Sequence, residues 1–171
     1  MNRQISKNSW RILLFGALIL GSVILQTTCR EVKNRNNTDT GVASSEFEFL
    51  EMDIIKIQQG YKDGAFTVKE LVQAYIDRIE AIDKQGPGLH SVIMVNPDAL
   101  KIAEQLDKEI KEGKIRGPMH GIPVLLKDNI DTHDKMPCTA GSRALAQSFP
   151  LKDSYVAMKL REAGALIIGK A

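Results

Sequence analysis

The sequence predicts an α/β fold with a mixed, mostly parallel sheet that is covered by helices on both faces. Short runs that are entirely apolar alternate with longer segments whose apolar residues recur at helical spacing. A strand that is apolar throughout needs cover on both faces, and helices that connect neighbouring strands provide it. With 171 residues, 43% hydrophobic and 26% charged, the chain can bury such a core.

Three apolar runs are expected to form the strands: residues 91–95, 122–126 and 165–168. Pro123 has no backbone N–H to donate, so it should lie at the start of its strand or on an edge strand. The run 165–168 is followed by only three residues, although both of its faces and its edges need cover. We therefore expect an incomplete sheet in a chain that is truncated.

The first expected helix spans residues 67–82, where apolar side chains recur on one face. Thr67 and Glu70 have the spacing of a capping box, in which each side chain satisfies a backbone N–H of the first turn. A Gly-Pro-Gly sequence at 86–88 should end this helix.

Two further helices are expected. The first begins with Asn96 as N-cap and Pro97 in the first turn and ends at Gly113, with one apolar side made by Leu100, Ala103, Leu106 and Ile110. The second begins at Asp153 or Ser154, which can accept a hydrogen bond from the first turn, and carries Val156, Leu160 and Ala163.

The N-terminus has the layout of a secretory signal. Arg3, Lys7 and Arg11 precede an uncharged apolar stretch at residues 12–25. This stretch is shorter than the roughly 20 residues that a membrane-spanning helix needs, although an uncleaved anchor is an alternative. Residues 1–28 are thus expected to be a signal peptide or N-terminal anchor, and the protein to be exported: periplasmic, membrane-anchored or secreted.

Cys29 follows this segment and resembles the lipid-attachment cysteine of bacterial lipoproteins, which would hold the protein at a membrane. Such signals usually have Leu three residues before the cysteine and a small residue directly before it, whereas this chain has Gln26 and Thr28. Lipidation, simple cleavage and retention all stay open. Residues 29–45 are rich in polar and charged side chains and are interpreted as a flexible linker, so the folded domain is expected at 46–171.

The charge and the cysteine content of the chain exclude several classes of protein. Residues 1–28 contain no acidic residue, so the remaining chain has 20 of the 23 basic residues against all 21 acidic ones. That balance provides no basic surface for nucleic acid. Two cysteines are too few for a disulfide framework, and neither they nor the three histidines have the spacing of a metal site. No cofactor or metal is expected, and the oligomeric state stays open.

Lys127 is the principal candidate for chemistry because it directly follows the apolar run 122–126. In sheets covered on both faces, ligands bind beyond the carboxyl ends of the strands. From spacing alone, the favoured interpretation is that Lys127 marks the point where the strand reaches water. Alternatively, a lysine held partly out of water favours its neutral form and can act as a general base.

Three segments together resemble the amidase signature family: GPMHGIPVLLKDNID at 117–131, MPCTAGS at 136–142 and KLREAGALIIGK at 159–170. The chain is most similar to bacterial peptide-amidase-like members, and the similarity runs in order from about Glu46 to the last residue. The resemblance implies the N-terminal part of the amidase signature fold and the hydrolysis of a small-molecule or peptide amide to a carboxylate and ammonia.

The same resemblance implies a Ser–cis-Ser–Lys mechanism, in which Lys127 deprotonates an intermediate serine that activates the nucleophilic serine. Both serines of the family lie in a Gly/Ser-rich segment downstream of the motif that begins here as Gly169-Lys170. Lys127 is then the only member of the triad in this chain, and the fragment alone is expected to be inactive. The competing hypothesis is a membrane-tethered binding or regulatory lipoprotein without catalysis.

The other polar residues near Lys127 are expected to support it. Asp128 and Asn129 could hydrogen-bond the loop and orient the lysine, and Ser142 is interpreted as a turn hydroxyl beside the site. Cys138 is interpreted as a small packing residue, not a nucleophile. His120, between Met119 and Gly121, is expected to be a turn or packing residue.

Overall fold

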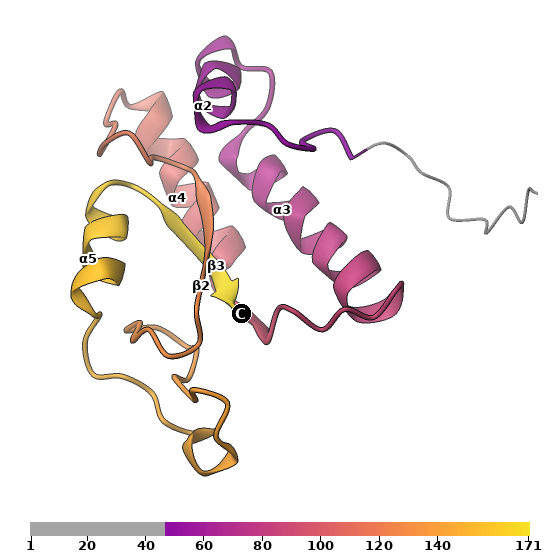
Figure 1. Cartoon of the computed structure of the whole chain (residues 1–171). Helices are drawn as coiled ribbons and strands as arrows, with labels where there is room; N and C mark the ends of the chain where they lie inside the picture. Colours follow the sequence, from indigo (N-terminus) through magenta and orange to yellow (C-terminus); the bar gives the residue numbers. More distant parts are fainter. Residues whose placement is uncertain (1–46) are drawn as a thin grey trace, which may run out of the picture. The chain divides into compact units, whose positions relative to one another are not determined.

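Residues 47–171 are described by a computed structural model (Figure 1). The chain divides into two units, Met1–Phe47 and Glu48–Ala171, and the following concerns the second. The predicted signal or anchor at 1–28, Cys29 and the predicted linker at 29–45 lie outside the described residues.

The second unit contains helices and strands in alternation. In chain order they are α2 (Ile54–Asp63), α3 (Val68–Arg78), the π-helix η1 (Ile79–Gln85), β1 (Met94–Val95), α4 (Ala99–Lys111), β2 (Pro123–Leu126), the 3₁₀-helix η2 (Arg143–Leu145), α5 (Tyr155–Glu162) and β3 (Leu166–Lys170). Across residues 47–171, none of these helices has the length and apolar character needed to span a bilayer.

The strands form one mixed sheet in the order β1-β3-β2. β3 lies in the centre, antiparallel to β1 and parallel to β2. A mixed sheet is therefore confirmed, with one pair of each kind. Pro123 is the first residue of β2, which is an edge strand among the described residues, so both expected positions of this proline are realised.

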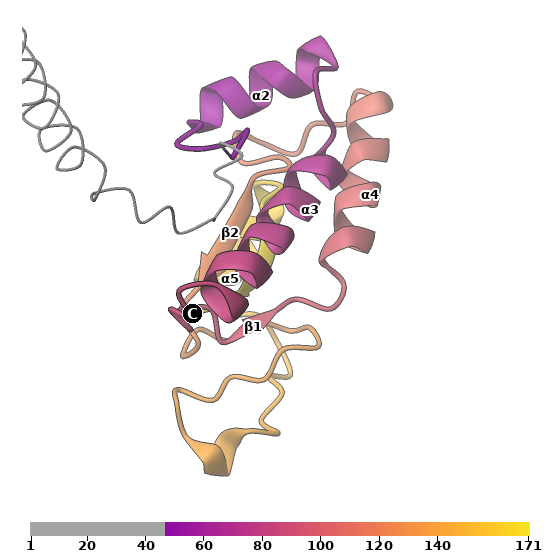
Figure 2. The same cartoon turned by 90° about the vertical axis from the view of Figure 1, so that its right-hand side faces the viewer.

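Helices cover both faces of the sheet, as predicted. Leu166 and Ile168 of β3 pack against α3 and α4 on one face, whereas Ile167 of β3 and Leu126 of β2 pack against α5 on the other. Figure 1 shows α3 and α5 on opposite sides of β2 and β3, and Figure 2 shows α3 and α4 side by side. β3 is buried along its whole length because it lies between these layers.

Two predicted helix starts are confirmed. Thr67 and Glu70 form the capping box at the start of α3, and the Ser154 hydroxyl accepts a hydrogen bond from the Ala157 N–H at the start of α5. The predicted apolar face of α5 is wrong in one position, because Val156 is 53% exposed whereas Ala157 is fully buried. At this point of α5, the methyl group of Ala157 packs against Ile167 of β3, and the branched side chain of Val156 does not.

The predicted start of α4 is also wrong. α4 begins at Ala99 with Asp98 as its N-cap residue, two residues after the expected cap. Asn96 is instead buried, and its amide donates a hydrogen bond of 2.9 Å to the Ile167 carbonyl. Its oxygen accepts from the Asp98 N–H at 3.0 Å, so residues 96–98 form a turn that ties the helix to β3.

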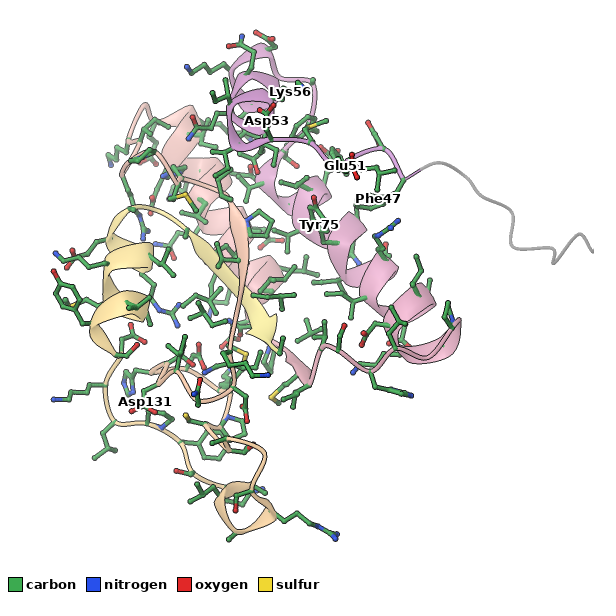
Figure 3. The ribbon with its side chains drawn as sticks, viewed as in Figure 1. Phe47, Glu51, Asp53, Lys56, Tyr75 and Asp131 are labelled. Carbon is green, nitrogen blue, oxygen red and sulfur yellow. The ribbon has the colours of Figure 1, made fainter. Side chains whose placement is uncertain are left out.

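One helix, α2, was not predicted from the sequence. It begins at Ile54, and the carboxylate of its N-cap residue Asp53 accepts a hydrogen bond from the Lys56 N–H at 2.8 Å (Figure 3). It ends at Gly64, which has a left-handed conformation with φ +67°. η1 continues α3 from Ile79 to Gln85 as a π-helix and ends directly before Gly86, where the Gly-Pro-Gly sequence was expected to end the helix.

The register of β3 is irregular. Val124 pairs with Ile167, but Leu125 pairs with Gly169, so Ile168 is an extra residue on the central strand. Gly169 makes this possible, because a Cβ there would lie 2.4 Å from the Met94 carbonyl oxygen of β1. An extra residue of this kind changes the face to which the following side chain points.

A buried carboxylate joins η1 to the segment before β1. Asp83 accepts hydrogen bonds from the Ser91 N–H at 2.7 Å, from the Ser91 hydroxyl, and from the Val92 N–H at 3.2 Å. The hydroxyl of Ser91 has the largest effect on this carboxyl and, with the backbone N–H groups, lowers its pKa to about 2. The network holds residues 91–92 next to the π-helix.

Asp83→Asn is expected to lower the melting temperature at pH 7 by about 5 °C, because it replaces an anionic acceptor of three hydrogen bonds. The depressed pKa stabilises the wild type above about pH 4, the ordinary range of the group, and this stabilisation is lost as the pH falls towards 2. Melting curves from pH 7 to pH 2 should therefore converge for the two proteins. A constant difference across this range would contradict the assignment.

Candidate active site

Lys127, Asp128 and Asn129 lie directly beyond the carboxyl end of β2, beside the carboxyl end of β3. The parallel hydrogen bonding continues past the strands, because the Ala171 N–H donates to the Leu126 carbonyl at 2.9 Å. The Asp128 N–H donates to the Ala171 carbonyl, also at 2.9 Å. The backbone on both sides of Lys127 is therefore fixed to the neighbouring strand.

Side chains alternate in burial along this segment. Leu126 and Asp128 are buried, whereas Leu125, Lys127 and Asn129 are exposed. Because successive side chains of an extended chain point to opposite faces, Lys127 leaves the sheet on the face of Leu125. Asp128 leaves it on the opposite face, where Leu126 packs against α5.

The face of Leu125 carries an apolar groove of about 500 Å³. Its walls come from α2, α3, η1 and the sheet, and include Ile57, Tyr75, Ile79, Ile82, Val92, Ile122, Leu125 and Ile168. Lys127 is two residues beyond Leu125, which is roughly 7 Å along an extended chain. Lys127 does not itself line the groove, but its side chain leaves the sheet on the same face, and the groove could accept an apolar group.

Residues 47–171 do not hold the side chain of Lys127 out of water, as the alternative interpretation required. Its side chain is exposed, in agreement with the interpretation that spacing alone favoured. A role as general base therefore requires further cover from substrate or from protein outside the described residues, and this role stays a prediction.

Asp128 organises the loop that follows. Its carboxylate accepts a hydrogen bond from the Thr139 hydroxyl and a longer one, of 3.4 Å, from the Gly141 N–H. Burial by itself would raise the pKa of Asp128, but these hydrogen bonds and the positive charge of Lys170 lower it below its usual value. The Asp128 carboxylate thus connects the end of β2 to residues 139–141.

Ser142 is brought close to this centre by the same loop. It follows Gly141 directly, and its N–H donates to the Thr139 carbonyl at 2.8 Å, so it belongs to the turn that Asp128 holds. Its side chain is exposed and does not cap η2. Asn129 is also exposed, and within residues 47–171 its side chain makes no hydrogen bond, so the structure gathers Asp128 and Ser142 but leaves Asn129 apart.

Cys138 packs under the loop. Its thiol donates to the Asp128 carbonyl, with 3.0 Å between Sγ and the oxygen. Burial, assisted by the neighbouring Asp131 carboxylate, raises the pKa of this thiol, so the reactive thiolate is disfavoured. Asp131 lies in the same segment after β2 (Figure 3).

His120 is buried in a turn. Its Nδ1 accepts from the Arg116 N–H at 3.2 Å, so Nε2 carries the proton and donates to the Leu106 carbonyl, also at 3.2 Å. Both ring nitrogens are thereby used within the fold. In the described part of the chain, no three His, Cys, Asp or Glu side chains are grouped where they could hold a metal ion.

Lys170 is a further residue near the site, and its environment was not predicted from the sequence. It is fully buried at the end of β3, and its ammonium donates a hydrogen bond to the Ile130 carbonyl. Lysine side chains are rarely fully buried, and the pairing of β3 with both neighbouring strands encloses this one. No pattern in the sequence indicates this burial.

Comparison with known proteins identifies a family and similar structures. Residues 70–171 match the model of the Amidase family. A solved structure of the native peptide amidase from Stenotrophomonas maltophilia is similar with a TM-score of 0.70 and 46% identity, over 72% of this chain and 25% of that chain.

Curated relatives come from several kinds of organism. A protein of Arabidopsis thaliana named as a probable amidase is 46% identical over 130 residues, which are 75% of this chain and 25% of that protein. A glutamyl-tRNA(Gln) amidotransferase component of Alkaliphilus metalliredigens is 41% identical over 120 residues, 70% of this chain and 24% of that protein.

The chain belongs to the Amidase family, since the family match covers more than half of its residues. Its three-stranded mixed sheet with helices on both faces corresponds to part of the amidase signature fold. The chain spans about a fifth to a quarter of the length of the curated relatives it matches.

Proposed function

We propose that the full-length protein hydrolyses primary amides to a carboxylate and ammonia, with Lys127 as the base of a Ser–cis-Ser–Lys mechanism. The observation that supports this most directly is the position of Lys127. It stands at the carboxyl end of β2, on the face of the apolar groove, in a chain of the Amidase family. The groove could hold the acyl side of an amide while the amine acts at the carbonyl end.

The proposed reaction begins when neutral Lys127 takes a proton from one serine, which in turn takes the proton of the nucleophilic serine. The nucleophile attacks the amide carbon, ammonia leaves with a returned proton, and water hydrolyses the resulting ester to the free carboxylate. Asp128 fixes the position of the lysine backbone through the loop 139–141. Both serines belong to segments outside residues 1–171, so we propose that the isolated chain is inactive.

Peptides with a C-terminal amide are the first substrates to test, because the similar solved structure from Stenotrophomonas maltophilia is that of a peptide amidase. The full-length protein should be incubated with a small aliphatic amide, an aromatic amide and an amidated dipeptide while ammonia is measured. Release of ammonia from at least one of them is expected. Binding of amides without any release would favour the non-catalytic lipoprotein.

We also propose that the protein acts outside the cytoplasm. The support is the order of basic residues, apolar stretch and Cys29 in the sequence. The mass of the N-terminal peptide from the native protein distinguishes the routes: a lipid-modified Cys29, a new N-terminus after cleavage, or an intact N-terminus for an uncleaved anchor.

A further inference from the structure

The irregular register of β3 turns Lys170 to the face of the sheet opposite to Lys127. Ile168 lies on the face of α3 and α4, and strict alternation would place Lys170 on that face too. The extra residue shifts the pairing, so that Lys170 pairs with Leu126 on one side and with Met94 on the other. Leu126 and Met94 both pack on the side of α5. Since paired residues share a face, Lys170 points there as well.

On that face, Lys170 is hydrogen-bonded to the segment that follows Lys127. Its ammonium donates to the carbonyl of Ile130, and its charge acts on the carboxylate of Asp128. The side chain has no exposed surface. A buried ammonium without an acceptor would be strongly destabilising, so the hydrogen bond to the Ile130 carbonyl is also a requirement of the fold.

We propose that Lys170 is a positioning residue for the amide-hydrolysing site: it clamps residues 128–130 from the α5 face and thereby fixes the direction in which Lys127 leaves the opposite face. The turn between them is short, because the Ile130 N–H donates to the Lys127 carbonyl at 2.9 Å. Movement of Ile130 is therefore transmitted to the backbone of Lys127. The catalytic part of this inference rests on the proposed function, whereas the clamp itself does not.

The clamp can be tested in the full-length protein with Lys170→Met, which keeps the length of the side chain and removes its charge. Lys159→Met is the matched control, because Lys159 is an exposed lysine paired with Glu162 at 2.7 Å. Amide hydrogen exchange should be measured at Ile130 and Gly141, with Ile102 of α4 as a reference, together with kcat and KM for amide hydrolysis.

For Lys170→Met we expect exchange at Ile130 and Gly141 to be at least about 10-fold faster, while Ile102 is unchanged. We expect kcat to fall about 100-fold with KM within about twofold, since a small displacement of a catalytic group impairs the reaction more than binding. Lys159→Met should match the wild type. Unchanged exchange at Ile130, or a loss that appears only in KM, would overturn the proposal. If the wild type releases no ammonia, the proposed function fails, and the exchange data alone decide on the clamp.

A second measurement covers the case in which Lys170→Met does not fold. Acylation of the native wild type should modify Lys170 at least about 100-fold more slowly than the exposed Lys152. In Asp128→Asn, which keeps the shape of the side chain and removes the opposite charge, acylation of Lys170 should become about 10-fold faster. Equal rates for Lys170 and Lys152 in the wild type, or no change in Asp128→Asn, would refute the clamp.

Discussion

Lys127→Ala is expected to reduce kcat/KM for amide hydrolysis by about 1,000-fold or more in the full-length protein, because it removes the proposed general base. The fold should be retained, since the side chain of Lys127 is exposed and the hydrogen bonds beside it are made by the backbone. Ammonia release and the melting temperature should be measured on the same preparation. Near-wild-type turnover would refute the assigned role.

Two control variants distinguish a role of Lys127 in proton transfer from a role of its positive charge alone. Lys127→Arg keeps the positive charge but cannot supply a neutral base, so it should be as inactive as the alanine variant. If Lys127 served only to attract an anionic group, the arginine variant would instead retain most of the activity. Lys152→Ala removes another exposed lysine, from the loop before α5, and should have wild-type kinetics.

Gly164→Ala is expected to destabilise the protein by about 3 kcal/mol, the largest effect on stability among the variants considered. Gly164 connects α5 to β3 with φ +91°, a conformation that residues with a Cβ rarely adopt. An added Cβ would lie 2.7 Å from the Cα of His120, whose segment is held there by a 2.9 Å hydrogen bond from the Gly121 N–H to the Gly164 carbonyl. Neither partner can move without disturbing the pairing of β2 with β3.

Gly113→Ala provides the matched control. Gly113 also has a positive φ, +71°, but no atom lies within 4 Å of the place where its Cβ would be. It should therefore cost only the conformational penalty, about 1 kcal/mol. Denaturant titration of both variants isolates the steric part, and equal losses would show that the contact with His120 is unimportant.

Local signals predicted the secondary structure well where the determining contact lies within a few residues. The capping box of Thr67 and Glu70 and the cap of Ser154 are of this kind, and both are present. Asn96 shows the limit, because its side chain bonds to Ile167, far away in the sequence, and α4 then begins two residues late. α2 was missed although Asp53 and Gly64 mark its two ends, since only Ile57 on it is buried and its apolar pattern is weak.

The sequence indicates a candidate site but not its geometry. The end of an apolar run indicated Lys127, and the structure places this residue directly after β2, two residues beyond Leu125, which lines the groove. The difference between Asp128, which is bonded, and Asn129, which is exposed, follows from which of them points towards α5. The burial of Lys170 depends on the extra residue in β3, which is a property of the pairing of three strands and not of any local pattern.

The order of the strands has a consequence for biosynthesis. The central strand β3 is the last of the three in the sequence, so among the described strands β1 and β2 have no neighbour to pair with until residues 166–170 have been synthesised. A nascent polypeptide leaving the ribosome thus carries two unpaired strands while the residues between β2 and β3 are being translated. Cotranslational closure of this sheet is excluded before Lys170 emerges, and a chaperone that protects those strands would act in that interval.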